Sequence, residues 1–150
     1  MADILHLIKI RAPREKVYQA LTTAEGVRNW WTRDTDLDSK VGGKGEFRFA
    51  KGTRVTTVSI EELKPASRVV WKAISAPIPT WADTRIEFEL HAEGDATLLA
   101  FAHRGFPEAD DMFAYSNTAW AQFILSLHEY LETGKGTPHP DDPISRPANS

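Results

Sequence analysis

A chain of 150 residues is long enough to bury the core of one ordinary domain, and its 41% hydrophobic and 26% charged residues are typical of a globular protein. A net charge of −3 argues against a nucleic-acid surface, the lack of cysteine excludes disulfides and thiol chemistry, and no apolar run approaches the ~18 residues of a membrane span. Since the first residues also lack the positive charge of a signal peptide, we expect a cytoplasmic protein that binds neither nucleic acid nor membranes.

The first predicted elements are a strand and two short helices. Residues 4–10, ILHLIKI, are rich in branched apolar side chains and predict a β-strand. Residues 13–23 predict a helix with Pro13 in its first turn, and residues 24–31 predict a second helical segment that ends in Trp30 and Trp31. Adjacent residues on a helix cannot both face one core, so we expect one of these two rings to point toward a cavity or the surface.

A run of antiparallel strands follows the polar stretch 32–41, which we interpret as a loop. Strand-like segments occupy residues 45–50, 54–63, 68–74, 84–94 and 96–106. Glu87 and Glu89 share the polar face of one strand, which indicates surface charge rather than an acid/base pair. In the last strand His103 is in phase with Leu99 and Phe101, so we place His103 at the edge of the buried layer.

The carboxy-terminal part predicts one long amphipathic helix over residues 110–133 and a disordered, proline-rich tail over residues 137–150. The apolar stripe of the helix is interrupted at Ser116 and Asn117. A polar residue on a buried stripe is unfavourable unless it has a partner or faces a wet cavity. The interruption therefore predicts either a pocket at Asn117 or a solvated end of the helix.

Together the elements predict an α+β fold with a single domain over residues 1–136. A curved antiparallel sheet would wrap around the long C-terminal helix, with two short helices after the first strand, because each apolar face needs the other. The space between a curved sheet and a straight helix need not fill completely, which leaves room for a ligand. The sequence contains no metal-ligand spacing, nucleophile elbow or dinucleotide fingerprint, so we predict no metal, cofactor or catalytic residue.

Several runs of the sequence resemble a known superfamily. They are IRAPREKVYQALTTAEGVRNWWT, VGGKGEFRF, EELKPASRVVWKA, TRIEFELHAEGDATLLAFAHRGFP and NTAWAQFILSLHEYLETGKG. Their order resembles the SRPBCC (START-like) superfamily and, within it, the family named for the C-terminal domain of the activator of Hsp90 ATPase, over residues 4–136. The resemblance implies the helix-grip fold around a hydrophobic cavity, and implies that Trp30-Trp31, Gly42-Gly43 and the turn at 103–106 maintain the fold. Its members bind apolar molecules and some are cyclases or hydrolases, so it predicts fold better than function.

We expect first a binding protein, a monomer or homodimer, for a hydrophobic small molecule or lipid-like ligand. The expected ligand-binding residues are Trp30, Phe47, Phe49, Trp71, Trp81, Phe101, His103, Asn117, Trp120 and Ile124. The alternative is a protein-interaction module related to Hsp90 co-chaperone domains, with Arg85, Glu87 and Glu89 on the outer face of the sheet. A third possibility, a cyclase- or hydrolase-like enzyme with His103 or Asp83 as general base, has no catalytic constellation behind it.

Overall fold

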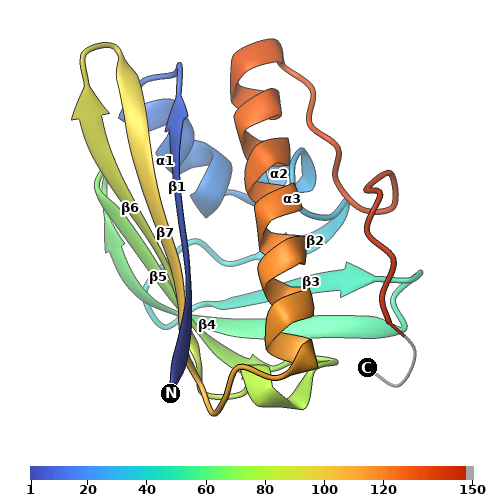
Figure 1. Ribbon diagram of the computed structural model, residues 1–150. Helices are drawn as coiled ribbons and strands as arrows, with labels where there is room; N and C mark the ends of the chain where they lie inside the picture. Colours follow the sequence, from blue (N-terminus) through green and yellow to red (C-terminus); the bar gives the residue numbers. More distant parts are fainter. Residues whose placement is uncertain (148–150) are drawn as a thin grey trace.

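Seven antiparallel strands form one curved sheet, and a long helix lies in its concavity (Figure 1). The computed structural model describes residues 1–147. The elements are β1 (Ala2–Ile10), α1 (Arg14–Thr22), α2 (Ala24–Arg28), β2 (Asp34–Leu37), β3 (Lys44–Phe49), β4 (Arg54–Lys64), β5 (Arg68–Ser75), the 3-10 helix η1 (Pro79–Trp81), β6 (Arg85–Glu93), β7 (Ala96–Phe106) and α3 (Asp111–Thr133). The strand order β1-β7-β6-β5-β4-β3-β2 makes β1 and β2 the edge strands. This is the expected α+β helix-grip architecture.

Local sequence signals define both ends of α3. The side chain of Asp110 caps the first turn, because its Oδ1 accepts a hydrogen bond from the backbone N–H of Phe113 at 2.9 Å. At the other end Gly134 adopts a left-handed φ of 90°, which glycine tolerates without strain, and its N–H bonds to the carbonyl of Tyr130. The helix therefore ends at Thr133 as predicted and begins at Asp111, one residue after the predicted start, with Asp110 as its cap.

The polar stretch 32–41 is not wholly a loop, because it contains β2. Arg48 of β3 donates hydrogen bonds to Asp34 and Asp36 of β2 at 2.9 and 2.8 Å, and Thr35 between them is buried. The acidic side chains that suggest a loop thus alternate outward along an edge strand and are neutralised by a neighbouring arginine. The expectation of a loop here is wrong for residues 34–37.

Trp30 and Trp31 are both buried, and Trp31 also lines a pocket, as expected for one ring of the pair. The helix α2 ends at Arg28, and the backbone N–H of Trp30 bonds to the carbonyl of Val27 in a turn. Because the two residues lie past the regular helix, their rings stack at 5.9 Å and both are buried. The indole N–H of Trp30 donates to the carbonyl of Ala20 at 2.8 Å, so its polar atom is satisfied inside the core.

The segment after α3 runs back beside the helix and touches the body of the domain (Figure 1). The backbone N–H of His139 donates to the carbonyl of Trp31 at 2.8 Å, and the N–H of Arg33 donates to the carbonyl of His139 at 3.2 Å. The tail is also bound to α3 itself, because the N–H of Thr137 donates to Oγ of Ser126 in that helix at 2.8 Å. These contacts differ from the disordered tail expected for residues 137–150, of which the last three lie outside the described residues.

Candidate functional site

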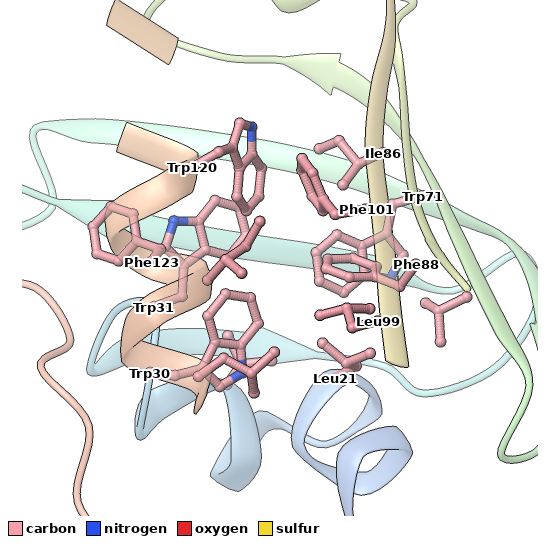
Figure 2. Close-up of a cluster of buried hydrophobic side chains, with 14 of the residues drawn as sticks. Leu21, Trp30, Trp31, Trp71, Ile86, Phe88, Leu99, Phe101, Trp120 and Phe123 are labelled. Atoms are coloured by element: carbon pink, nitrogen blue, oxygen red, sulfur yellow. The ribbon is translucent and has the colours of Figure 1, made fainter. Parts of the chain in front are cut away.

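The middle of the space between sheet and helix is filled by aromatic rings. Figure 2 shows side chains from the sheet meeting Trp120 of α3 and the tryptophan pair. Phe47 and Trp71 pack at a ring distance of 5.4 Å, and Phe88 and Phe101 pack at 5.3 Å. Five of the expected ligand-binding residues are buried in this packed centre and do not line the pocket beside α3: Trp30, Phe47, Trp71, Phe101 and Ile124. Rings at such distances leave no room for a ligand.

A pocket of about 120 Å³ lies beside the first half of α3. Its walls come from the β3–β4 hairpin, the β5–η1 segment, α3 and the tail, and its aromatic lining includes Trp31, Phe49, Trp81 and Trp120. An apolar cavity of about 150 Å³ in another protein holds benzene. The pocket therefore has the volume of a single small ring, and the structure brings Phe49, Trp81 and Trp120 of the expected residues together around it.

Ser116 explains the interruption of the apolar stripe on α3. Its side chain is fully buried, and its Oγ accepts a hydrogen bond from the indole N–H of Trp81 at 2.9 Å. The same hydroxyl donates to the carbonyl of Met112 at 2.7 Å. An indole N–H can only donate, so a buried one needs an acceptor, and the hydroxyl of Ser116 supplies it. The serine thereby orients the ring of Trp81 in the pocket wall.

Asn117 does not face the pocket. Its side chain is exposed to solvent and is not among the lining residues, whereas its neighbour Ser116 is. Successive helical residues are about 100° apart, so only one of the two can lie on the buried stripe. The assignment of Asn117 to the cavity is therefore corrected.

His103 lies behind the pocket wall in a hydrogen-bonded chain. The indole N–H of Trp120 donates to Nδ1 of His103 at 3.0 Å, so Nδ1 is an acceptor and the ring proton is on Nε2. Nε2 lies 2.7 Å from Oγ1 of Thr84, whose hydroxyl donates to the carbonyl of Trp81. The ring also packs against Trp81 at 4.7 Å. His103 therefore joins both tryptophan walls of the pocket to the sheet.

The same surroundings keep His103 neutral. Burial lowers the pKa of His103 to about 3, because the charged imidazolium would lose its hydration inside the protein. A second proton on Nδ1 would also point at the N–H of Trp120, donor against donor. Neither nitrogen is free to take a proton from a ligand, and the other proposed base, Asp83, is exposed and forms an ion pair with Lys72 at 3.7 Å. Neither residue is placed as a general base of the pocket.

Part of the pocket lining is polar, and the sequence alone did not identify it. Asp142 and Arg146 of the tail contribute to it together with Arg54 at the start of β4. His139 fastens the tail there: its Nε2 accepts the backbone N–H of Ala50 at 3.0 Å, and its Nδ1 lies 2.9 Å from Oδ1 of Asp142. The one sequence signal for this attachment is Ile144, the single large apolar residue of the tail, which also lines the pocket.

Residues 1–147 contain neither a membrane-spanning helix nor a cluster of metal-binding side chains. No helix there combines the length and apolar character needed to cross a bilayer. Within the same residues no three His, Asp or Glu side chains come together in an arrangement that could hold a metal ion.

The comparisons with known proteins agree with this architecture. A family model described as "Activator of Hsp90 ATPase homolog 1-like protein" matches residues 11–132. The solution structure of the Aha1 dimer from Colwellia psychrerythraea is 39% identical in sequence, covers 91% of this chain and 100% of its own, and superposes with a TM-score of 0.81. No curated protein matches the chain.

More distant structures share the fold alone. The protein MLL2253 from Mesorhizobium loti is 20% identical, with 87% of this chain and 97% of its own covered and a TM-score of 0.77. CalU16 from Micromonospora echinospora is 21% identical, with 88% of this chain and 77% of its own covered and a TM-score of 0.72. At such identities the likeness carries no function.

Proposed function

The chain belongs to the family of activator of Hsp90 ATPase homolog 1-like proteins, and from this membership and the pocket beside α3 we propose that it binds a small apolar molecule there. The observation that carries the proposal is the contrast between the packed centre of the domain and this one aromatic-walled space. Protein interiors are close-packed, so a space that large side chains surround without filling is an exception that a ligand would explain. The volume suits a single ring or a short branched chain.

The walls of the pocket are rigid enough to select a shape. Trp31 and Trp120 have ring centroids 5.0 Å apart, and Trp81 and Trp120 stack at 6.0 Å. Hydrogen bonds fix the indoles of Trp81 and Trp120 to Ser116 and His103. A pre-organised wall loses little side-chain entropy when a ligand binds, which favours affinity for a compound of matching shape.

A pocket-filling variant tests the proposal. Ala119 on α3 lines the pocket, so Ala119→Phe places a ring inside it, whereas Ala114→Phe makes the same change on the exposed face of the same helix. We expect a neutral ring compound such as p-cresol to change tryptophan emission saturably and raise the melting temperature of the wild type and of Ala114→Phe, but not of Ala119→Phe. Stabilisation should follow mass action, about 2.7 kcal/mol at a hundredfold excess over Kd.

The proposal fails if no single-ring or short-chain apolar compound shifts the emission or the melting temperature of the wild-type protein. It also fails if Ala119→Phe binds such compounds as well as Ala114→Phe does, because binding would then lie elsewhere.

We propose as a second function that the outer face of β1 and β7 associates with a second copy of the chain. Leu5 and Leu7 are 62% and 68% exposed on the edge strand β1, and they pair with Ala102 and Ala100 of β7, whose small side chains leave a hollow beside them. Exposed leucines next to an unpaired strand edge favour self-association. A two-fold axis would set leucine against leucine, and the Colwellia psychrerythraea relative is a dimer.

Sedimentation velocity over a range of concentrations tests the second function. We expect the wild-type chain to dimerise and the double variant Leu5→Lys, Leu7→Glu to stay monomeric. Leu125→Lys is the matched control, because Leu125 is a comparably exposed leucine, 55%, on α3 rather than on the sheet. A wild-type chain that is monomeric throughout, or a double variant that still dimerises, would refute the role of this face without affecting the pocket.

A further inference from the structure

Thr56 of β4 is a polar residue on the inward face of the sheet. Burial alternates along β4, and Thr56 is in phase with Val58 and Ile60, which belong to the hydrophobic core. Only 4% of Thr56 is exposed, and its partner across the strand pair is the buried Phe47 of β3. Since side chains two positions apart point to the same face of a strand, Thr56 faces the concave interior, where it lines the pocket beside α3.

The hydroxyl of Thr56 is open to a ligand. No hydrogen bond joins this hydroxyl to another group within residues 1–147, although the residue is almost completely buried. The oxygen is nevertheless not sealed inside the packed core, and because Thr56 lines the pocket, the space that the oxygen reaches is the pocket. Ser116 in the same lining differs, since its hydroxyl already accepts from Trp81 and donates to Met112.

Folding does not explain a hydroxyl at position 56. A buried hydroxyl without a protein partner is unfavourable, and valine, which forms strands as readily as threonine, fills the same volume with a methyl group instead. The next inward residue of β4 is in fact a valine, Val58. In the empty pocket only solvent can pair with Thr56. A purely apolar ligand that displaces this solvent strands the hydroxyl, whereas a ligand with an oxygen at that place restores the hydrogen bond.

We infer that Thr56 determines the specificity of the pocket, and that the ligand is an uncharged ring compound with one hydrogen-bonding oxygen, such as a phenol, held against the hydroxyl of Thr56. This inference rests on the proposed binding function and adds the polar group of the ligand to it. A threonine hydroxyl both donates and accepts, so a hydroxyl or a carbonyl oxygen of the ligand satisfies it, and neither requires a charge to be buried. The pocket volume of about 120 Å³ limits the apolar part to about one ring, since a comparable cavity holds benzene.

Isothermal titration calorimetry with p-cresol and p-xylene tests the inference, because the two compounds have nearly the same shape and differ by a hydroxyl in place of one methyl group. In Thr56→Val the Kd of p-cresol should rise about two- to tenfold, which is the range expected for the loss of one net hydrogen bond. The Kd of p-xylene should stay the same or fall, because its binding no longer strands a hydroxyl. Thr56→Ser keeps the hydroxyl and should keep the wild-type ratio of the two Kd values.

Thr57→Val is the control, because it makes the same substitution at the next residue of β4, which faces the other side of the sheet and lies outside the pocket lining. Both Kd values should remain those of the wild type. In urea denaturation without ligand, Thr56→Val should be at least as stable as the wild type, since it removes a buried hydroxyl that no protein group satisfies.

Three results would overturn the inference while leaving the proposed binding function intact. They are a ratio of Kd values that Thr56→Val leaves unchanged, a ratio that Thr57→Val changes as much as Thr56→Val does, and a clear loss of stability in unliganded Thr56→Val, which would assign the hydroxyl to folding. If neither compound binds the wild type and no other single-ring compound does, the proposed function itself fails, and this inference fails with it.

Discussion

Lowering the pH should destabilise the protein through His103 more than through any exposed histidine. The ordinary pKa of a histidine side chain is 6.5, and burial lowers that of His103 to about 3 in the folded protein. At a pH between these two pKa values, the side chain of His103 is protonated in the unfolded chain and neutral in the folded chain. Stability rises with pH wherever the unfolded state binds more protons, so the contribution of His103 is complete above about pH 6.5 and is lost as the pH falls toward 3.

The size of the effect follows from the pKa difference. At pH 4.5 the unfolded imidazole is almost fully protonated and the folded one is almost fully neutral. The two pH units between 6.5 and 4.5, at about 1.4 kcal/mol each, predict a loss of about 2.7 kcal/mol relative to pH 7.5. This loss changes little for any native pKa below about 4, since the folded ring stays neutral at pH 4.5 throughout that range.

Urea denaturation followed by circular dichroism at pH 7.5 and pH 4.5 measures the free energies of unfolding. His103→Gln keeps a donor and an acceptor at the site but cannot titrate, so the variant should lose about 2.7 kcal/mol less than the wild type between the two pH values. Titrating carboxylates affect both proteins alike and cancel in the difference. His91→Gln serves as the control, because it makes the same substitution at an exposed position of β6.

An equal loss in the wild type and in His103→Gln would refute the reasoning, because His103 would then titrate like an ordinary histidine. So would an NMR titration in which the ring signals of His103 move with a midpoint near pH 6.5 in the native state.

Three further variants test the packing around the pocket by equilibrium denaturation. Trp120→Ala should cost about 3–5 kcal/mol, because it empties a buried ring site and leaves Nδ1 of His103 without its donor; a cost below about 1 kcal/mol would mean that the ring faces open space. Ser116→Ala should cost about 1–3 kcal/mol by leaving the indole N–H of Trp81 without its acceptor, and an unchanged stability would contradict that role. Asn117→Leu should change stability by less than about 0.5 kcal/mol and leave p-cresol binding unaltered, since the side chain is exposed; an altered affinity would return Asn117 to the pocket.

The elements with local signals were predictable from the sequence. The helix α3 has its cap, its apolar stripe and its terminal glycine within its own segment, and β6 shows its two faces by simple alternation. Such patterns report which side of an element is apolar, and the pairing of a curved sheet with one long helix follows because those sides must be buried together. The resemblance to the family implied the same fold, and the family model that matches residues 11–132 confirms the resemblance.

The location of the pocket could not be predicted from the sequence, because it depends on how completely side chains fill the space between the sheet and α3. The gap in the stripe spans Ser116 and Asn117, and the sequence led us to assign the pocket to Asn117, whereas the hydrogen bond from Trp81 places Ser116 there. Likewise the burial of both Trp30 and Trp31 depends on where α2 stops and which rings of the sheet receive them. Neither outcome is encoded in the spacing of residues along one element.

The sequence by itself determined the kind of fold, the extent of α3 and the presence of an aromatic interior, because each of these follows from local periodicity and the need to bury apolar faces. The tertiary structure alone decided that the tail forms a wall of the pocket. The hydrogen bond from the N–H of Ala50 to His139 joins residues 89 positions apart. Arg54 and Arg146 likewise line one pocket only because distant segments of the chain meet there. Contacts of that range depend on the shape of the assembled domain, and a polar, proline-rich segment carries no periodic signal from which they could be predicted.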